Sequence, residues 1–200
     1  MSFESNRFIE LLRPEYNDAL KYCRALCSKR SADDADDIMQ QSLMKALENF
    51  RSLKNEESFR PWLFSIITRE YYNWIRKDFW RRFLPSDDEK QFPEKPELID
   101  RGQEVFFGND IAAALNCLND KERSALLLFE TGGFSIEEIK DIQGERSLSA
   151  IKSRLSRARG KLREFFNNEG VKPAKTFNKE ISEGDINDET YRLIQEARGK

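Results

Sequence analysis

The sequence contains no histidine among its 200 residues. Imidazole is the general base of Ser-His-Asp and Cys-His nucleophile systems and the commonest metal ligand in proteins. Its absence therefore excludes those hydrolases and histidine-containing zinc sites. An enzyme that works with carboxylates, lysine or cysteine alone stays open at this point, and we predict no metal or cofactor.

Cysteine is scarce as well, and the chain holds three, an odd number. An odd count does not build a disulfide framework and indicates a reducing compartment. Cys23 and Cys27 are four residues apart and could in principle hold a metal. They coincide with an apolar helical stripe and lack further ligands, so we predict that both are buried core residues, and Cys117 likewise.

Long apolar runs are missing, because none exceeds five residues, as at 125–129. A helix that spans a bilayer needs about 20 apolar residues, so we predict no membrane insertion. The first residues also lack the basic segment and apolar stretch of a secretory signal. We therefore expect a cytoplasmic location.

The net charge of −2 conceals an uneven distribution. Residues 59–82 carry six basic and two acidic side chains, a net +4, and residues 147–166 carry six and one, a net +5. Between them, residues 83–109 carry seven acidic and three basic side chains, a net −4. Two basic blocks separated by an acidic spacer indicate two contacts with a polyanion.

Apolar residues recur every three or four positions in the first 82 residues, which predicts helices throughout. Pro14 is expected to break or bend the first of them. The acidic run at 33–37 suits the N-terminus of the second. The third is the most strongly patterned and runs from Phe59 to about residue 82.

The pattern changes at residue 84, where a stretch with three of the six prolines begins. We predict an all-α protein of two small helical domains, 1–83 and 110–167, joined by an extended acidic linker at 84–109. The polar tail, 168–200, is expected to be loose or to form one short helix. The apolar positions of that helix would be Ile186, Tyr191, Ile194 and Ala197.

A helix-turn-helix pattern lies near the end of the second domain. Ser135 and Glu138 form a capping-box signature, Gly144 is a plausible helix stop, and a basic helix with an apolar back follows. Asn119 and Glu122 resemble a further capping box. A recognition helix must offer donors to bases and phosphates while its back packs on the preceding helix. On the pattern alone, a solvated basic helix of an ordinary bundle is an equally good interpretation.

The third helix carries a stripe of cations and aromatics outside its core face. Cations can meet phosphates and rings can stack on unpaired bases, which suits a melted strand. The alternative is an aromatic core, which we favour for Trp62 and Trp74. Tyr72 and Trp80 lie off the core face and are better stacking candidates. The stripe consists of Ser65, Arg69, Tyr72, Asn73, Arg76 and Trp80.

Carboxylates and amides gather on the exposed side of the second helix, at Asp36, Asp37, Gln40 and Gln41. Sequential carboxylates at a helix start do not converge on one ion, so helix capping or a protein-binding face is favoured over a metal site.

Three motifs together resemble the region-2 and region-4 signatures of bacterial extracytoplasmic-function (group IV) sigma factors. They are DADDIMQQ at 34–41, FRPWL at 59–63 and IKSRLSRAR at 151–159. Their order and spacing fit the family, and the resemblance covers residues 8–166. It implies a specificity subunit without its own enzymatic chemistry, whose partners are core RNA polymerase, promoter DNA and an anti-sigma factor.

The resemblance also implies roles for individual residues. Asp36, Asp37, Gln40 and Gln41 would bind core polymerase. The loop at 51–58, with Arg51, Lys54, Asn55 and Ser58, would hold a base flipped from the −10 element. The adjoining −10 strand would follow Arg69, Tyr72, Asn73, Arg76 and Lys77. The major groove of the −35 element would receive Ser149, Lys152, Ser153, Arg154 and Arg157.

Two other functions remain as alternatives. A sigma mimic that sequesters an anti-sigma factor would need the partner face but not the basic recognition helix, which this chain retains. A free-standing helix-turn-helix repressor would leave the aromatic third helix and the Asp36–Gln40 face unexplained.

Overall fold

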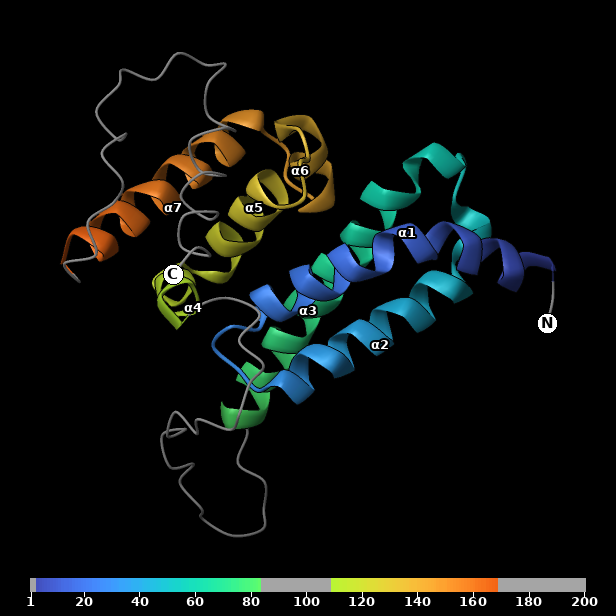
Figure 1. The fold of residues 1–200 in the computed structure, drawn as a ribbon, viewed down its shortest axis with the longest axis horizontal. Helices are drawn as coiled ribbons and strands as arrows, with labels where there is room; N and C mark the ends of the chain where they lie inside the picture. The colour runs from blue at the N-terminus through green and yellow to red at the C-terminus, as the bar shows by residue number, and fades with distance from the viewer. Residues whose placement is uncertain (1–2, 84–108, 169–200) are drawn as a thin grey trace, which may run out of the picture.

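The computed structural model describes residues 3–83 and 109–168, and every regular element within these ranges is a helix (Figure 1). The N-terminal unit contains α1 (Phe3–Leu26), α2 (Ala32–Glu48), the 3-10 turns η1 (Phe50–Ser52) and η2 (Glu56–Ser58), and α3 (Phe59–Phe83). The C-terminal unit contains α4 (Asn109–Asn116), α5 (Asp120–Glu130), α6 (Ile136–Ile142) and α7 (Leu148–Asn168). The predicted linker, except residue 109, and the predicted tail beyond residue 168 lie outside the described residues.

Helix α1 continues through Pro14, so of the predicted break or bend the break is wrong, and the bend stays a prediction. A proline inside a helix removes one backbone hydrogen bond and costs about 3 kcal/mol. The helix continues because core packing holds it on both sides of the proline, where Phe8 and Ala19 are buried. Tertiary contacts here override local propensity.

Helices α2, α5 and α6 each begin at a capping box, in which a side chain and a backbone N–H are satisfied reciprocally. The acidic start of α2 and both capping signatures in the C-terminal unit are thereby confirmed. The residue pairs are Ser31 with Asp34, Asn119 with Glu122, and Ser135 with Glu138.

The turn between α6 and α7 confirms the predicted helix stop. Gly144 has a φ of 64°, a conformation that side chains other than glycine rarely adopt. The N–H of Glu145 then bonds to the carbonyl of Lys140 at 2.8 Å, which satisfies one of the last carbonyls of α6.

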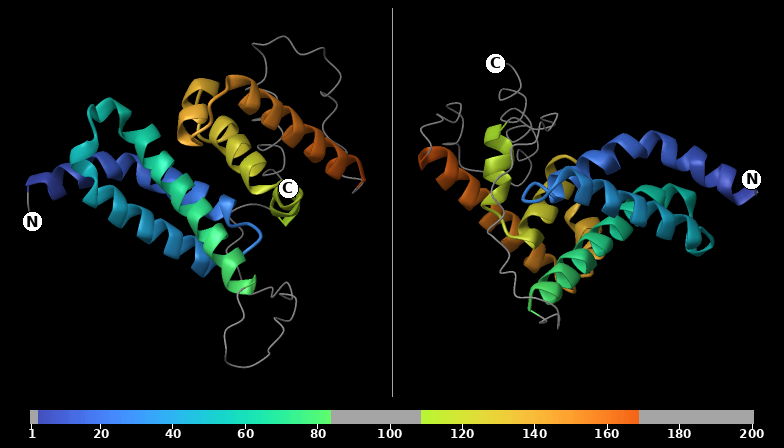
Figure 2. Two further views of the ribbon diagram at one scale, coloured as in Figure 1. Left: turned by 180° about the vertical axis from the view of Figure 1, so that it is seen from behind. Right: turned by 90° about the horizontal axis from the view of Figure 1, so that it is seen from below.

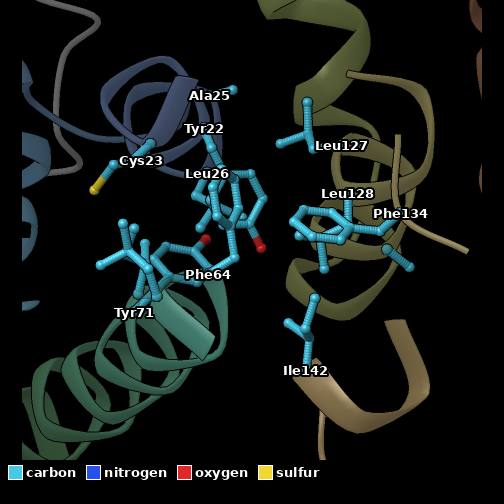
Figure 3. Close-up of a cluster of buried hydrophobic side chains, with 14 of the residues drawn as sticks. Tyr22, Cys23, Ala25, Leu26, Phe64, Tyr71, Leu127, Leu128, Phe134 and Ile142 are labelled. Carbon is cyan, nitrogen blue, oxygen red and sulfur yellow. The ribbon is translucent and has the colours of Figure 1, made fainter. Parts of the chain in front are cut away.

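One hydrophobic core runs through both units. Figure 3 shows Tyr22, Leu26 and Phe64 of the N-terminal unit facing Leu128 and Phe134 of the C-terminal unit. The rings of Phe64 and Phe134 are 5.0 Å apart between centroids. Helix α3 packs on α6, and α1 on α5, so the C-terminal unit lies beside the N-terminal one (Figures 1 and 2).

The cysteines divide into two kinds. Cys23 and Cys27 are buried, as predicted, whereas Cys117 is exposed and its predicted burial is wrong. Cys117 follows α4. Leu115 in α4 and Leu118 after it are both buried, and the Cys117 side chain between them points outward. The Cys23 thiol donates to the carbonyl of Ala35 at 3.1 Å, and its bond with Cys27 together with burial raises its pKa.

Candidate nucleic-acid interface

The α2 surface, defined by Asp36, Asp37, Gln40 and Gln41, faces solvent. Its neighbours Ile38 and Met39 are buried against α1 and α3. The Asp36 carboxylate lies 3.5 Å from the guanidinium of Arg24. Across residues 3–83 and 109–168, no group of three or more acidic or cysteine side chains could hold a metal ion. The surface is therefore a polar face of α2 whose opposite side is buried.

The loop at 51–58 consists of two 3-10 turns whose polar side chains are exposed. Its backbone is anchored from α1: the ring of Phe50 lies 5.4 Å from that of Phe8, and Arg7 Nε donates to Glu56 at 2.8 Å. Asn55 caps the second turn by accepting the N–H of Glu57 at 3.1 Å. The predicted loop residues Arg51, Lys54, Asn55 and Ser58 are all exposed.

The predicted strand-contacting residues of α3 differ in exposure. Arg69, Arg76 and Lys77 are exposed, and Asn73 is half-buried between two neighbours. Asn73 donates to Glu70 at 3.3 Å and accepts from Arg76 at 3.0 Å. These contacts orient the Arg76 guanidinium along the helix.

Tyr72 does not lie with these exposed residues. Its hydroxyl oxygen is 2.6 Å from that of Ser124 on α5 and accepts from Gln143 at 3.3 Å. Burial raises the pKa of Tyr72 to about 12. The prediction that Tyr72 is available to a DNA strand therefore does not hold in this arrangement, because the C-terminal unit covers its ring.

The three tryptophans of α3 differ in burial as predicted. Trp62 and Trp74 pack against the core, and the guanidinium of Arg30 lies 4.4 Å from the Trp74 ring centroid. Trp80 is 55% exposed, so it is the stacking candidate that stays accessible.

The outward face of α7 is polar and exposed, and it carries Ser149, Lys152, Ser153 and Arg157. The opposite face is apolar and buried, and it carries Ile151, Leu155 and Ala158. This separation of a basic front from an apolar back is the one that a recognition helix requires. It also shows that α7 is packed into a core along its back.

Arg154 departs from the predicted groove-contacting set, because it is 8% exposed. Its guanidinium donates to the side-chain oxygen of Gln143 and to Glu145 at 2.7 Å. Held in this way, the guanidinium lies away from the exposed front of α7 in this structure, and its predicted groove contact stays a prediction. Arg154 instead joins the start of α7 to the turn after α6.

Cations of α7 are also held by a buried carboxylate. Glu122, 2% exposed, accepts from Lys161 at 2.7 Å and lies 3.6 Å from the guanidinium of Arg157. Arg157 nonetheless keeps 60% of its side chain exposed. The carboxylate thus orients Arg157 without covering it.

One fully buried polar contact between the two units is one that the sequence did not reveal. Arg123 of α5 is fully buried and donates to the carbonyl of Leu26, the last residue of α1, at 2.7 Å. It also donates to the carbonyls of Leu115 and Leu118, each at 3.1 Å, and to the Tyr71 hydroxyl at 3.2 Å. A single guanidinium therefore supplies hydrogen-bond donors to backbone carbonyls at the C-terminal ends of α1 and α4.

Arg123 could have been noticed only as a charge at the start of an apolar run, 125–129, which is a weak signal. Its acceptors are carbonyls, and carbonyls are present at every helix end. Asp120 completes the site by accepting from Tyr71 at 2.7 Å and lying 3.7 Å from Arg123.

The fold and these surfaces define a two-part, all-helical DNA-binding protein with a helix-turn-helix in its C-terminal unit. In the described residues, no helix has the length and apolar character needed to cross a membrane. The family profile described as Sigma-70 region 2 matches residues 11–81, and that described as Sigma-70, region 4 matches residues 108–162.

Two curated relatives are similar over most of their length. The ECF RNA polymerase sigma factor EcfG of Rhodopseudomonas palustris is 34% identical over 139 residues, 69% of this chain and 74% of the relative. The RNA polymerase sigma factor SigV of Bacillus subtilis is 30% identical over 138 residues, 68% of this chain and 78% of the relative.

Two solved structures share the fold. The sigma factor RpoE of Bartonella quintana, solved with the anti-sigma factor NepR, matches with a TM-score of 0.61 and 28% identity over 80% of this chain and 98% of its own. CnrH, solved with the cytosolic domain of CnrY, matches with a TM-score of 0.57 and 19% identity. The match covers 82% of this chain and 90% of the CnrH chain.

The chain belongs to the extracytoplasmic-function (group IV) sigma factor family. It is a sigma factor, a specificity subunit that binds core RNA polymerase and directs initiation to promoters through their −10 and −35 elements. The predicted family, all-α fold class and function are confirmed. From here the N-terminal unit is called region 2 and the C-terminal unit region 4.

Proposed function

We propose that this sigma factor acts through three separate surfaces, one for polymerase and two for DNA. The observation that carries the proposal is the outward exposure of three polar faces on helices whose other sides are buried. The polymerase surface is the α2 surface, with Asp36, Asp37, Gln40 and Gln41. Its carboxylates and amides supply acceptors and donors for a protein partner.

The −10 surface runs from the 51–58 loop along α3. Arg51, Lys54, Asn55 and Ser58 surround a flipped base, while Arg69, Asn73, Arg76 and Lys77 follow the adjoining strand. Exposed cations supply the phosphate contacts, and the amide of Asn73 can read a base edge. Tyr72 joins this surface only after region 4 has moved away from it.

The −35 surface is the front of α7, with Ser149, Lys152, Ser153 and Arg157. Arg157 is the best candidate for a bidentate contact with guanine, because its planar donor fork is exposed and oriented by Glu122. Arg154 is a positioning residue that fixes the start of α7 against Gln143 and Glu145.

Binding to both elements requires regions 2 and 4 to separate. The names of the elements place them about 25 base pairs apart, or roughly 85 Å at 3.4 Å per base pair. In the structure, atoms of the two regions are within hydrogen-bonding distance, as at Arg123 and Leu26. The packed arrangement is therefore a closed state, and the linker at 84–108 joins the regions after they separate.

An anti-sigma factor is the partner that fits such a closed state. The similar sigma factor RpoE was solved in complex with the anti-sigma factor NepR. We propose that this chain likewise binds an anti-sigma factor, acts in the cytoplasm where the polymerase works, and has no enzymatic activity of its own. A sigma mimic would not need the exposed cations of α7.

The test is multi-round transcription in vitro with core polymerase from the source organism and fragmented genomic DNA. Mapping of transcript 5′ ends with and without the protein should reveal new starts that share paired upstream elements. An absence of new starts together with an absence of core binding would favour the sigma mimic.

A further inference from the structure

Glu70 is a buried carboxylate in the middle of the helix that carries the −10 surface. It is 5% exposed, and its Oε2 accepts a hydrogen bond from Nζ of Lys45 on α2 at 2.6 Å. A buried carboxylate costs free energy unless an opposite charge and hydrogen bonds offset that cost. An apolar pair of similar size is often as stable as a buried ion pair, so stability alone does not account for a charge at this position.

The other oxygen of Glu70 begins a chain of hydrogen bonds along α3. Oε1 accepts from Nδ2 of Asn73 at 3.3 Å, and Oδ1 of Asn73 accepts from Arg76 at 3.0 Å. Residues three apart on a helix are neighbours on its surface. The chain of bonds therefore starts at a buried charge held by α2 and ends at an exposed guanidinium of the −10 surface.

The chemistry of the two ends fixes the direction of the amide between them. A carboxylate only accepts hydrogen bonds, and a guanidinium only donates them. The amide of Asn73 therefore keeps its NH2 group towards Glu70 and its oxygen towards Arg76. The reversed amide would place two acceptors together at one side and two donors together at the other.

We propose that Glu70 is a positioning residue for −10 recognition. Anchored by Lys45, it fixes the direction of the Asn73 amide and, through that amide, the Arg76 guanidinium before DNA binds. Side chains that are already ordered lose less conformational entropy on binding than mobile ones. Glu70 acts through Asn73 rather than by touching DNA, because it is buried. The inference rests on the proposed −10 surface of α3.

The first variant replaces the acid by an amide. In Glu70→Gln, Lys45 holds the single oxygen of the new side chain, whose NH2 group then faces Asn73. The Asn73 amide has to turn over, and Arg76 loses its acceptor. We expect initiation from a promoter mapped as described above to fall about ten-fold, with the preference for the −35 element unchanged. Glu137→Gln makes the same change at an exposed site of α6 and should initiate as the wild type does.

The second variant makes the reciprocal change. Asn73→Asp places two carboxylates side by side, and we expect initiation to fall about ten-fold or more. When Glu70→Gln and Asn73→Asp are combined, the new amide donates to the new carboxylate, which again accepts from Arg76. This double variant should initiate within about three-fold of the wild type. Asn73→Asp is thus harmful in one background and beneficial in the other, a change of sign that a general loss of stability does not produce.

Circular dichroism and co-purification with core polymerase check that each variant folds and binds. Losses that simply add in the double variant would overturn the inference, and so would wild-type initiation by Glu70→Gln. Asn73→Asp keeps the Lys45–Glu70 pair, so its wild-type initiation would overturn the inference even if Glu70→Gln did not fold. Normal initiation by Arg76→Ala would instead contradict the proposed −10 surface.

Discussion

The hydroxyl oxygens of Tyr72 on α3 and Ser124 on α5 lie 2.6 Å apart, and Gln143, the C-cap residue of α6, donates to both. Gln143 in turn accepts from Arg154 of α7. A polar network therefore connects the helix that carries the −10 surface with the recognition helix. These two helices can act on separate promoter elements only when this network is broken.

Removal of the Tyr72 hydroxyl should loosen the closed state. Tyr72→Phe keeps the ring but loses the bond to Ser124, which is worth about 1 kcal/mol. Urea unfolding should show a free energy of unfolding lower by about that amount. Tyr16→Phe, which alters an exposed tyrosine, should leave it unchanged. An equal change in both variants would contradict the contribution of this contact.

Truncation of Arg123 should be far more damaging. Arg123→Ala leaves the carbonyls of Leu26, Leu115 and Leu118 without their donor in a buried site. Each such group costs about 1–3 kcal/mol, so we expect a total loss of about 3 kcal/mol or more. Arg123→Lys should rescue little, because one ammonium cannot replace a planar fork with several donors. Thermal and urea unfolding measure both variants, with Lys152→Ala as the exposed control. A near-native Arg123→Lys would show that charge alone suffices.

The two arginines at the start of α7 should give different phenotypes. Arg157→Ala should weaken −35-dependent initiation by about 1–3 kcal/mol, with unfolding unchanged, because the side chain is exposed. Arg154→Ala should lower the free energy of unfolding, because Glu145 and Gln143 lose their partner. Transcription on promoters with intact and scrambled −35 elements, alongside urea unfolding, separates the effects. Unchanged transcription by Arg157→Ala would rule out its groove contact.

Replacement of Asp37 and Gln40 together by alanine should abolish association with core polymerase. Both side chains are exposed, so the circular dichroism spectrum should stay that of the wild type. Co-purification with core polymerase measures the association. Glu137→Ala, an exposed change in region 4, should bind normally. Normal co-purification of the double variant would refute the assignment of the α2 surface.

Stability should fall in acid partly through Glu145. The hydrogen bond from Arg154, with that from Lys121, holds the pKa of the Glu145 carboxyl below its usual value. A lowered folded-state pKa adds stability above the unfolded pKa of about 4.3 and loses it as the pH falls towards the folded one. Glu145→Gln should therefore flatten the pH dependence of unfolding below about pH 5. If the free energy of unfolding of Glu145→Gln fell with pH as steeply as that of the wild type, the loss of stability in acid would come from other carboxylates.

Much of the local structure was predictable because its causes are local. The capping boxes at Asn119 and Ser135 and the glycine stop at Gly144 depend on residues within one helical turn. The apolar periodicity of α2 and α7 also predicted which faces lie outward. The exposure of Asp37 and Lys152 follows from the same periodicity.

Other outcomes depended on what packs from a distance. Tyr72 lies off the core face of its own helix, yet Ser124, 52 residues later in the chain, approaches it. Arg154 sits in the most basic stretch, yet Gln143 and Glu145 capture it. The residue pattern of one helix does not show which side chains of another helix will form hydrogen bonds with it.

The sequence by itself therefore determined the helices, the caps at Asn119 and Ser135 and the outward faces of α2 and α7, because spacing along one helix decides each of these. The family followed from the resemblance of three motifs, taken in their order along the chain. Only the tertiary structure decided that Arg123 caps the end of α1, that Tyr72 is covered and that Cys117 is exposed. Those depend on contacts between distant segments, whose free energy is gained only when the whole core assembles.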